Sequence, residues 1–274
     1  MLTTLLVFLY HTHTGILGGE TDLVFHQILD PRLGCASYLV GCPESGELLV
    51  VDPLEAVGVN EYVLRAADLG LQVTQIVDTH LHADHVSVGR ELATATGAIY
   101  MLHKDAAVTY PFVPVGDGDE ISIGRNRVRV LHTPGHTDES ISLLVFDGSR
   151  SLDLPWMILS GDSLFVGDVA RPDLAVDELS DEDIQGRLGR LRQSVEKLAA
   201  YPEFVELYPG HYGVSACGGA GMSAKASSTI GFEQRFNAAL QTQTGTGFAE
   251  FVRIGMKPLP DRYQEIKRHN MGLD

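Results

Sequence analysis

The sequence predicts an α+β protein with two sheet-rich halves that carry helices on their outer faces. In the first half, short apolar runs alternate with segments of helical periodicity in the order βαβαβ. In the middle of the chain, β-rich runs follow one another without helices between them, which is typical of antiparallel neighbours. The longest helical pattern comes after these runs, and no flexible linker separates the halves, so we expect one compact body.

Glycine, proline and aspartate separate the β-rich runs of the first half. Strands are expected there at residues 23–29, 36–40, 48–51, 73–77 and 98–102. A helix is expected at residues 61–69, because its apolar residues have helical spacing and Gly70 follows as a stop signal. A second helix is expected at residues 86–96, between the last two strands.

The second half is expected to begin as an antiparallel sheet. Its strands are expected at residues 121–123, 128–131, 141–146, 156–159 and 204–207. The longest helix is expected at residues 181–200, since Ser180 can act as its N-cap and acidic side chains fill its first turn. Further helices are expected at residues 229–240 and 248–254. The tail to Asp274 is polar and weakly specified.

Composition limits the classes of partner. The 274 residues are 44% hydrophobic, which supplies a full core and excludes disorder. Acidic side chains outnumber basic ones by 36 to 20, for a formal charge of −16, so we expect neither nucleic acid nor a membrane surface as a partner. We therefore expect a small-molecule substrate.

The N-terminus and the cysteines bear on location. Residues 1–20 are expected to be a loose extension, because glycines follow His11 and His13 without further ligands. The apolar stretch at residues 5–10 lacks preceding basic residues and is too short to span a membrane, so no signal peptide is expected. The three cysteines include no CxxC pair, and a reducing cytoplasm is the expected location.

Four side chains of metal-ligand type crowd the loop that follows the expected strand at residues 73–77. They are His80, His82, Asp84 and His85. Imidazole and carboxylate bind divalent transition metals, and a loop at a strand end lets alternate side chains point into one cavity. A polar loop with incidental histidines is the alternative, but it gives no reason for this crowding. The loop therefore predicts a metal site.

Three more residues of ligand type stand at expected strand ends. They are His136 in TPGHT, Asp162 in GDSLF and His211 in PGH. Taken singly, each is more often a turn histidine or a capping aspartate. Together with the loop they complete a ligand set.

The motifs HxHxDH, TPGHT, GDSLF and PGH, in this order, resemble those of the metallo-β-lactamase superfamily. The resemblance spans about residues 23–240 and implies a four-layer αββα sandwich. It implies a catalytic domain at residues 21–240, with residues 241–274 as a C-terminal helical segment packed on it.

In the dinuclear members of this superfamily, seven ligands surround two metal ions. The resemblance implies one metal on His80, His82 and His136, the other on Asp84, His85 and His211, and Asp162 bridging them. Two Zn(II) ions around a hydroxide would make a hydrolase.

The residues that flank the motifs resemble the bacterial persulfide dioxygenases, without the rhodanese domain that some of them carry. The similar segments are HADHVS, GDSLFVGDVARPDL and SSTIGFE. Proteins of this group hold one Fe(II) on two histidines and one aspartate, which correspond to His80, His136 and Asp162. Such a facial triad leaves three positions for sulfur and dioxygen. The other ligand-type residues would then orient ligands and bind water; they are His82, Asp84, His85 and His211.

This resemblance implies the oxidation of a low-molecular-weight thiol persulfide, such as glutathione persulfide, by O2. Oxygen transfer to the terminal sulfur gives a sulfinate-like intermediate, and water then releases sulfite and the free thiol. Arg171 stands at the family's arginine position, where it would bind a carboxylate of the carrier thiol. Alternatively, Arg171 is a surface arginine that neutralises Asp168 and Asp173. Tyr212, directly after His211, is a second candidate for substrate binding.

Other functions stay open. A dinuclear zinc thioesterase of glyoxalase II type fits the full ligand set, although Tyr212-Gly213-Val214 replaces that family's usual Glu-Tyr-Thr. A binding protein that holds metal without turnover is a third hypothesis. The sequence does not decide the carrier thiol, iron against zinc, or whether the chain forms a homodimer. Cys217 lies six residues after His211 in a glycine-rich loop, and we expect it to be a buried, inert thiol.

Overall fold

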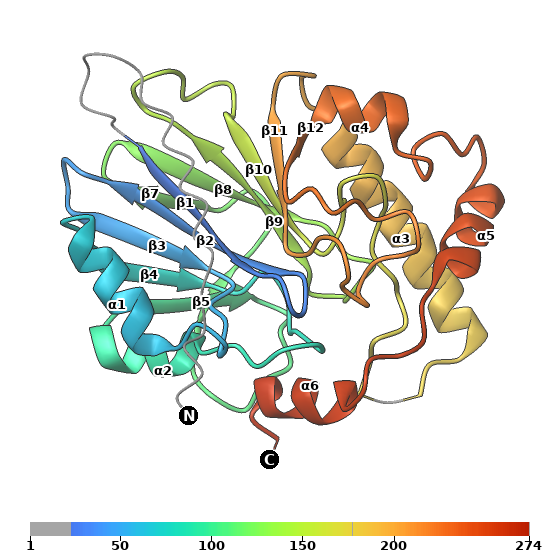
Figure 1. Ribbon diagram of the computed structural model, residues 1–274, viewed down its shortest axis with the longest axis horizontal. Coiled ribbons are helices and arrows are strands. Elements are labelled where there is room, and N and C mark those ends of the chain that lie inside the picture. Colours follow the sequence, from blue (N-terminus) through green and yellow to red (C-terminus); the bar gives the residue numbers. More distant parts are fainter. Residues whose placement is uncertain (1–22, 177, 274) are drawn as a thin grey trace, which may run out of the picture.

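Two six-stranded sheets form the centre of the protein in the computed structural model, which describes residues 23–176 and 178–273. The strand order is β1-β2-β3-β4-β5-β6 in the first sheet and β12-β11-β10-β9-β8-β7 in the second. The expected extension at residues 1–20, with its His11 and His13, lies outside the described residues. Figure 1 shows α1 and α2 on one side of the sheets and α3, α4 and α5 on the other.

The first sheet contains the predicted βαβαβ unit. Its strands are β1 (Val24–Asp30), β2 (Cys35–Cys42), β3 (Glu47–Val51), β4 (Gln72–Val77), β5 (Ile99–His103) and β6 (Val113–Val115). The strands β1 to β3 pair antiparallel, and β3 to β6 pair parallel. Parallel neighbours need crossover connections, which α1 (Val59–Asp68) and α2 (Gly89–Thr96) supply. The short strand β6 was not predicted.

The second sheet is antiparallel from β7 to β10, as predicted. Its strands are β7 (Glu120–Ile123), β8 (Asn126–His132), β9 (Ile141–Phe146), β10 (Met157–Gly161), β11 (Glu206–Pro209) and β12 (Ser228–Thr229). The long helix α3 (Asp181–Ala199) connects the parallel pair β10 and β11. Ser180 caps it as predicted, in a reciprocal capping box with Asp183.

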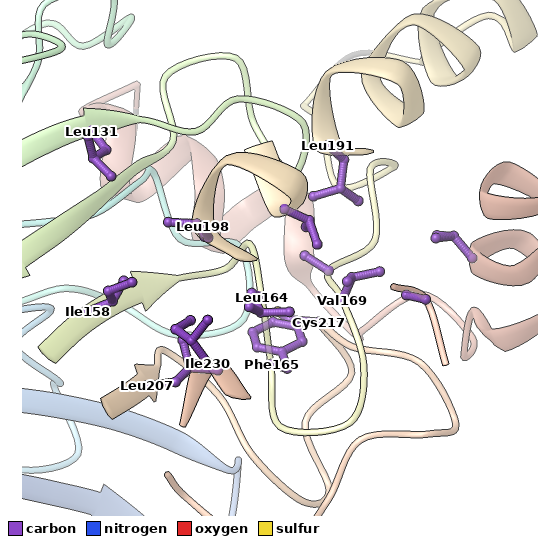
Figure 2. Close-up of a cluster of buried hydrophobic side chains, with 14 of the residues drawn as sticks. Leu131, Ile158, Leu164, Phe165, Val169, Leu191, Leu198, Leu207, Cys217 and Ile230 are labelled. Carbon is purple, nitrogen blue, oxygen red and sulfur yellow. The ribbon is translucent and has the colours of Figure 1, made fainter. Parts of the chain in front are cut away.

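Three buried apolar clusters fill the spaces between four layers. One lies between the sheets and includes Tyr38 and Leu143. A second packs α1 and α2 on the first sheet and includes Tyr62. The third packs α3, α4 (Ile230–Phe236) and α5 (Gly245–Gly255) against the second sheet, and Figure 2 shows Leu191 and Leu198 within it. The predicted four-layer αββα sandwich is confirmed.

Two predicted helices were too long, because a buried polar side chain ends each one. Before α2, the Ser87 hydroxyl donates to Asp78 and accepts from the Gly89 amide, so residues 86–88 belong to the preceding loop. The helix α4 ends at Phe236, where the buried Asn237 amide donates to backbone carbonyls of another loop.

The polar pattern of the tail predicted no particular helix after residue 254, although the family resemblance implied a C-terminal helical segment at residues 241–274. The tail forms α6 (Tyr263–Met271), whose partners lie far away in the sequence. Among the described residues, none of the helices combines the length and the apolar character needed to cross a bilayer.

Candidate metal centre

The seven predicted ligands gather at one edge of the sandwich, where strands of both sheets end. The loop that follows β4 carries four of them, and the segments after β8, β10 and β11 carry one each. Their side chains are at most 8% exposed. The sheets therefore bring together residues that are widely separated in the sequence.

Glycines in two of the motifs permit the close packing of these loops. Gly135 has φ +144°, and a Cβ atom there would lie 2.4 Å from the Leu191 backbone in α3. Gly161 has φ +50°, and a Cβ atom there would lie 2.7 Å from the Thr79 hydroxyl. Any other residue at these positions would push the loops apart.

Three of the seven ligands converge with their donor atoms toward one point. His80, His136 and Asp162 offer donor atoms that all lie within 4.8 Å of one another. The Asp162 Oδ2 atom is 3.7 Å from His80 Nε2 and 3.5 Å from His136 Nε2. All three atoms are buried without a hydrogen-bond partner among the described residues. Because buried polar atoms are nearly always paired, this group fits a metal ion.

The opposite atoms of the same three side chains are fixed by the protein. His136 Nδ1 donates to the Arg171 carbonyl at 2.6 Å, which leaves Nε2 as the ligand atom. His80 Nδ1 lies 3.0 Å from the Thr79 hydroxyl, and Asp162 Oδ1 lies 2.7 Å from His211 Nδ1. Burial lowers the pKa of both triad histidines, so the rings are neutral and able to bind metal.

His82 does not join this group. Its Nε2 atom lies 3.1 Å from a carboxylate oxygen of Asp52, and it groups with Asp52 and Asp78 instead. Its Nδ1 atom is buried without a hydrogen-bond partner among the described residues. Asp52, with φ +50°, also accepts from the Thr79 amide and hydroxyl. Sequence analysis missed Asp52, because the parallel pairing of β3 with β4 is what brings it beside the loop.

The remaining ligands, Asp84, His85 and His211, form with Cys35 a second group whose possible ligand atoms lie within 4.8 Å of one another, and His85 Nε2 has no hydrogen-bond partner among the described residues. His211 Nε2 lies 2.7 Å from Asp84 Oδ2, and His85 Nδ1 lies 3.1 Å from Asp84 Oδ1. Burial alone would lower the pKa of His211, but Asp162 and Asp84 raise it well above its ordinary value. Burial alone would raise the pKa of Asp84, but His211 and His85 lower it well below its ordinary value. A protonated His211 therefore bridges two carboxylates, and a second metal would have to displace that proton.

Two cysteines lie near these residues. Cys35 was not predicted, since a lone cysteine carries no sequence signal; its sulfur is 3.3 Å from Asp84 Oδ2. Cys217 is fully buried beside Phe165 in the third apolar cluster (Figure 2). Burial raises the pKa of Cys217 well above its ordinary value, which keeps it a thiol.

The two expected substrate residues differ in their surroundings. The Arg171 side chain is 3% exposed, so it is buried and is not the surface arginine of the alternative interpretation. It forms an ion pair with Asp173, one of the two partners expected in that interpretation. Its Nε and Nη2 atoms donate to Asp173. Its Nη1 atom donates to the backbone carbonyls of residues 216, 257 and 258, so all three guanidinium nitrogens have partners within the protein. Tyr212 is half-buried, and its amide donates to the Gly34 carbonyl.

The helix α6 is fastened to the metal-binding loop, which the sequence did not reveal. The Asn270 side chain donates to the carbonyls of His82 and His85 at 2.9 Å each and accepts from the Ser87 amide at 3.1 Å. A pocket of about 900 Å³ opens between this helix, the β1–β2 turn and the loop. Asp84 and His85 form part of its wall.

Comparison with known proteins places the chain in a family. Residues 30–211 match the family model described as the metallo-beta-lactamase superfamily. The match covers more than half of the chain, so this protein belongs to the metallo-β-lactamase superfamily. The crystal structure of ETHE1 from Myxococcus xanthus has a TM-score of 0.75 and 25% identity, over 92% of this chain and all of that one.

Curated relatives include two kinds of enzyme. The hydroxyacylglutathione hydrolase of Polaromonas sp. is 33% identical over 64% of this chain and 61% of its own length. The mitochondrial persulfide dioxygenase ETHE1 of Bos taurus is 27% identical over 71% of this chain and 70% of its own length. The chain thus spans about three fifths of the first hydrolase relatives. These identities are too similar to decide between the two reactions.

Proposed function

We propose that this protein is a non-haem Fe(II)-dependent persulfide dioxygenase. Its substrate would be a low-molecular-weight thiol persulfide such as glutathione persulfide, and its location the cytoplasm. The balanced reaction is RSSH + O2 + H2O → RSH + SO3²⁻ + 2 H⁺. The observation that carries the proposal is the convergence of three unpartnered donor atoms from His80, His136 and Asp162 toward one point. His82 Nδ1 and His85 Nε2 are also buried without a hydrogen-bond partner among the described residues, but neither belongs to this group of three.

Two imidazoles and one carboxylate on one face are the ligand set of non-haem Fe(II) oxygenases. When bound, Fe(II) supplies open positions for sulfur and O2 and the electrons that activate O2. The sequence similarity to the persulfide dioxygenase ETHE1 and the fold similarity to an ETHE1 crystal structure support this choice of reaction. The unpaired state of all three cysteines is consistent with a cytoplasmic location.

The protein's own groups have distinct tasks in this proposal. The Arg171 carbonyl orients the His136 ring, and protonated His211 holds Asp162 through its second oxygen. The proton on His211 keeps Asp84 and Asp162 from repelling each other, since it lies between the two carboxylates. Burial of the triad excludes bulk water from the reacting sulfur.

A dinuclear zinc thioesterase of hydroxyacylglutathione hydrolase type is the second candidate. The presence of all seven ligand residues favours it, as does the identity with the hydrolase relatives. In a dinuclear zinc site, the hydrogen bond between Asp84 and His211 must break so that both side chains can bind the second ion.

Anaerobic purification followed by metal analysis and two assays tests the proposal. We expect one iron per chain, O2 uptake with glutathione persulfide, and one sulfite formed per O2. The His136→Ala variant should lose both iron and O2 uptake. His103→Ala is the matched control, because His103 is also buried but stacks on His132, outside the triad. Two bound zinc ions with hydrolysis of S-lactoylglutathione and no O2 uptake would refute the proposal in favour of the thioesterase.

A further inference from the structure

The pocket between α6, the β1–β2 turn and the metal-binding loop is large enough for a small molecule. Its volume of about 900 Å³ lies within the range of about 300 to 1,000 Å³ that is usual for such sites. The triad residues are at most 2% exposed, so the carrier part of a thiol persulfide has to be held outside the triad. Arg171 cannot hold the carrier, because its guanidinium nitrogens already have partners within the protein.

The pocket adjoins the metal centre. Asp84 and His85 form part of its wall. The centroid of the His85 ring lies 4.2 Å from that of His82, which in turn lies 4.1 Å from that of His80 in the triad. A single imidazole ring therefore separates the wall of the pocket from the triad.

One face of α6 forms another wall. The residues that α6 and its first turn contribute are three and four positions apart, which places them on the same side of the helix. They are Arg262, Glu265, Ile266 and His269. The turn between β1 and β2 adds Arg32, and Figure 1 shows this turn beside α6. The helix lies outside residues 30–211, so the match to the family model does not account for this wall.

Three charged side chains of the pocket keep groups available for a ligand. Arg32 donates to Asp30, and Arg262 to Glu265, in both cases through Nε and Nη2. The two arginine side chains are 64% and 71% exposed, and the Nη1 atom of each has no hydrogen-bond partner in the described part of the chain. Glu55 is exposed and forms no ion pair with another described residue. Because exposed ion pairs are weak, a ligand carboxylate can compete for either guanidinium.

The backbone of Arg262 is strained. Its φ of +59° is in the left-handed region, which side chains other than glycine rarely adopt. Among the described residues, Asp52 is the other non-glycine residue with positive φ, and it holds His82. Strain of this kind is concentrated at functional sites, which supports a binding role for the start of α6.

We infer that this pocket is the carrier subsite and that it takes a zwitterionic thiol with two carboxylates and one ammonium group. The inference rests on the proposed function, since it concerns the thiol that carries the persulfide. Arg32 and Arg262 bind the two carboxylates, and Glu55 binds the ammonium group. Glutathione and bacillithiol both have these three groups. Coenzyme A has phosphates in place of the carboxylates and lacks the ammonium group.

Calorimetric titration of the anaerobic iron-loaded protein with S-methylglutathione tests the subsite without turnover. This probe keeps the charged groups of the carrier, but it has no persulfide sulfur to oxidise. Arg32→Gln, Arg262→Asn and Glu55→Gln should each weaken its binding by about tenfold, the value of one charge-assisted hydrogen bond. Asparagine is chosen at position 262 because it tolerates the left-handed backbone. Arg129→Gln is the matched control and should bind the probe as the wild type does, since Arg129 forms an exposed ion pair with Glu120 outside the pocket.

A change in the ligand tests the same contacts from the other side. The ethyl ester of S-methylglutathione lacks one carboxylate and should bind the wild type more weakly. One of the two arginine variants should show no such difference, because it already lacks the partner of that carboxylate. Coenzyme A should bind more weakly than S-methylglutathione. S-methylbacillithiol distinguishes the two carriers, and the tighter-binding derivative identifies the one that fits.

The inference is overturned if the three pocket variants bind S-methylglutathione as the wild type does, or if coenzyme A binds as tightly as this probe. We expect equal iron content and melting temperature in all variants, because the replaced side chains are exposed. If a variant does lose iron or stability, the affinity of its folded, loaded fraction decides. Binding that depends on the pocket in a protein without O2 uptake would refute the dioxygenase and support the subsite. O2 uptake from glutathione persulfide, with wild-type probe binding in the pocket variants, would do the reverse.

Discussion

Replacement of Asn270 by alanine should detach α6 from the metal-binding loop. The side chain is 5% exposed and makes three hydrogen bonds to the loop backbone. Each bond contributes about 0.5 to 1.5 kcal/mol, and loop groups left without water cost more. We therefore expect a loss of about 2 to 4 kcal/mol in the free energy of unfolding. The loop would also lose its backbone order, which should weaken Fe(II) binding by about 10- to 100-fold.

Urea unfolding followed by circular dichroism measures the first effect, and Fe(II) titration against a competing chelator measures the second. Asn126→Ala is the matched control, because Asn126 is 1% exposed and also bonds to the backbone, but at the opposite end of β8 from the triad. It should lose stability and keep its metal affinity. Wild-type metal affinity in Asn270→Ala, or an equal loss of affinity in both variants, would refute the link between α6 and the loop.

Three further predictions concern packing, pH and metal. Gly135→Ala should cost about 3 kcal/mol and reduce iron content, because its Cβ would clash with Leu191; wild-type stability in urea would contradict this. Partial burial raises the pKa of Asp138, but Arg187 and Arg190 lower it below its ordinary value. Its ion pairs therefore contribute to the free energy of unfolding above about pH 4, and this contribution is lost as the pH falls through the pKa of Asp138 in the folded protein. Asp138→Asn should thus lose only about 0.5 kcal/mol at pH 7, given its exposure, and nothing in strong acid; a loss at both pH values would exclude the ion pairs as the cause. Removal of the metal by a chelator should lower the melting temperature, which added Fe(II) should restore; an unchanged temperature would show that the buried donors do not need an ion.

Local patterns in the sequence were enough to predict much of the fold. Alternation of apolar runs with helical spacing predicted the βαβαβ unit, and Ser180 with its acidic first turn predicted the start of α3. These features depend on residues within a few positions of one another, so they can be recognised without the tertiary structure. The ends of α2 and α4 were mispredicted, because Ser87 and Asn237 have partners in other parts of the chain.

The sequence by itself determined which ligand-type residues are available, since the motifs that contain all seven are local. Only the tertiary structure decided how they are used. The sheets bring His80, His136 and Asp162 together, and the pairing of β3 with β4 gives His82 a different partner. Likewise, α6 became specified only by its contacts with distant parts of the chain, among them the loop, Tyr110 and Leu174, because a short polar helix is not stable alone. Distances between donor atoms depend on how distant segments pack, and no local pattern contains that information.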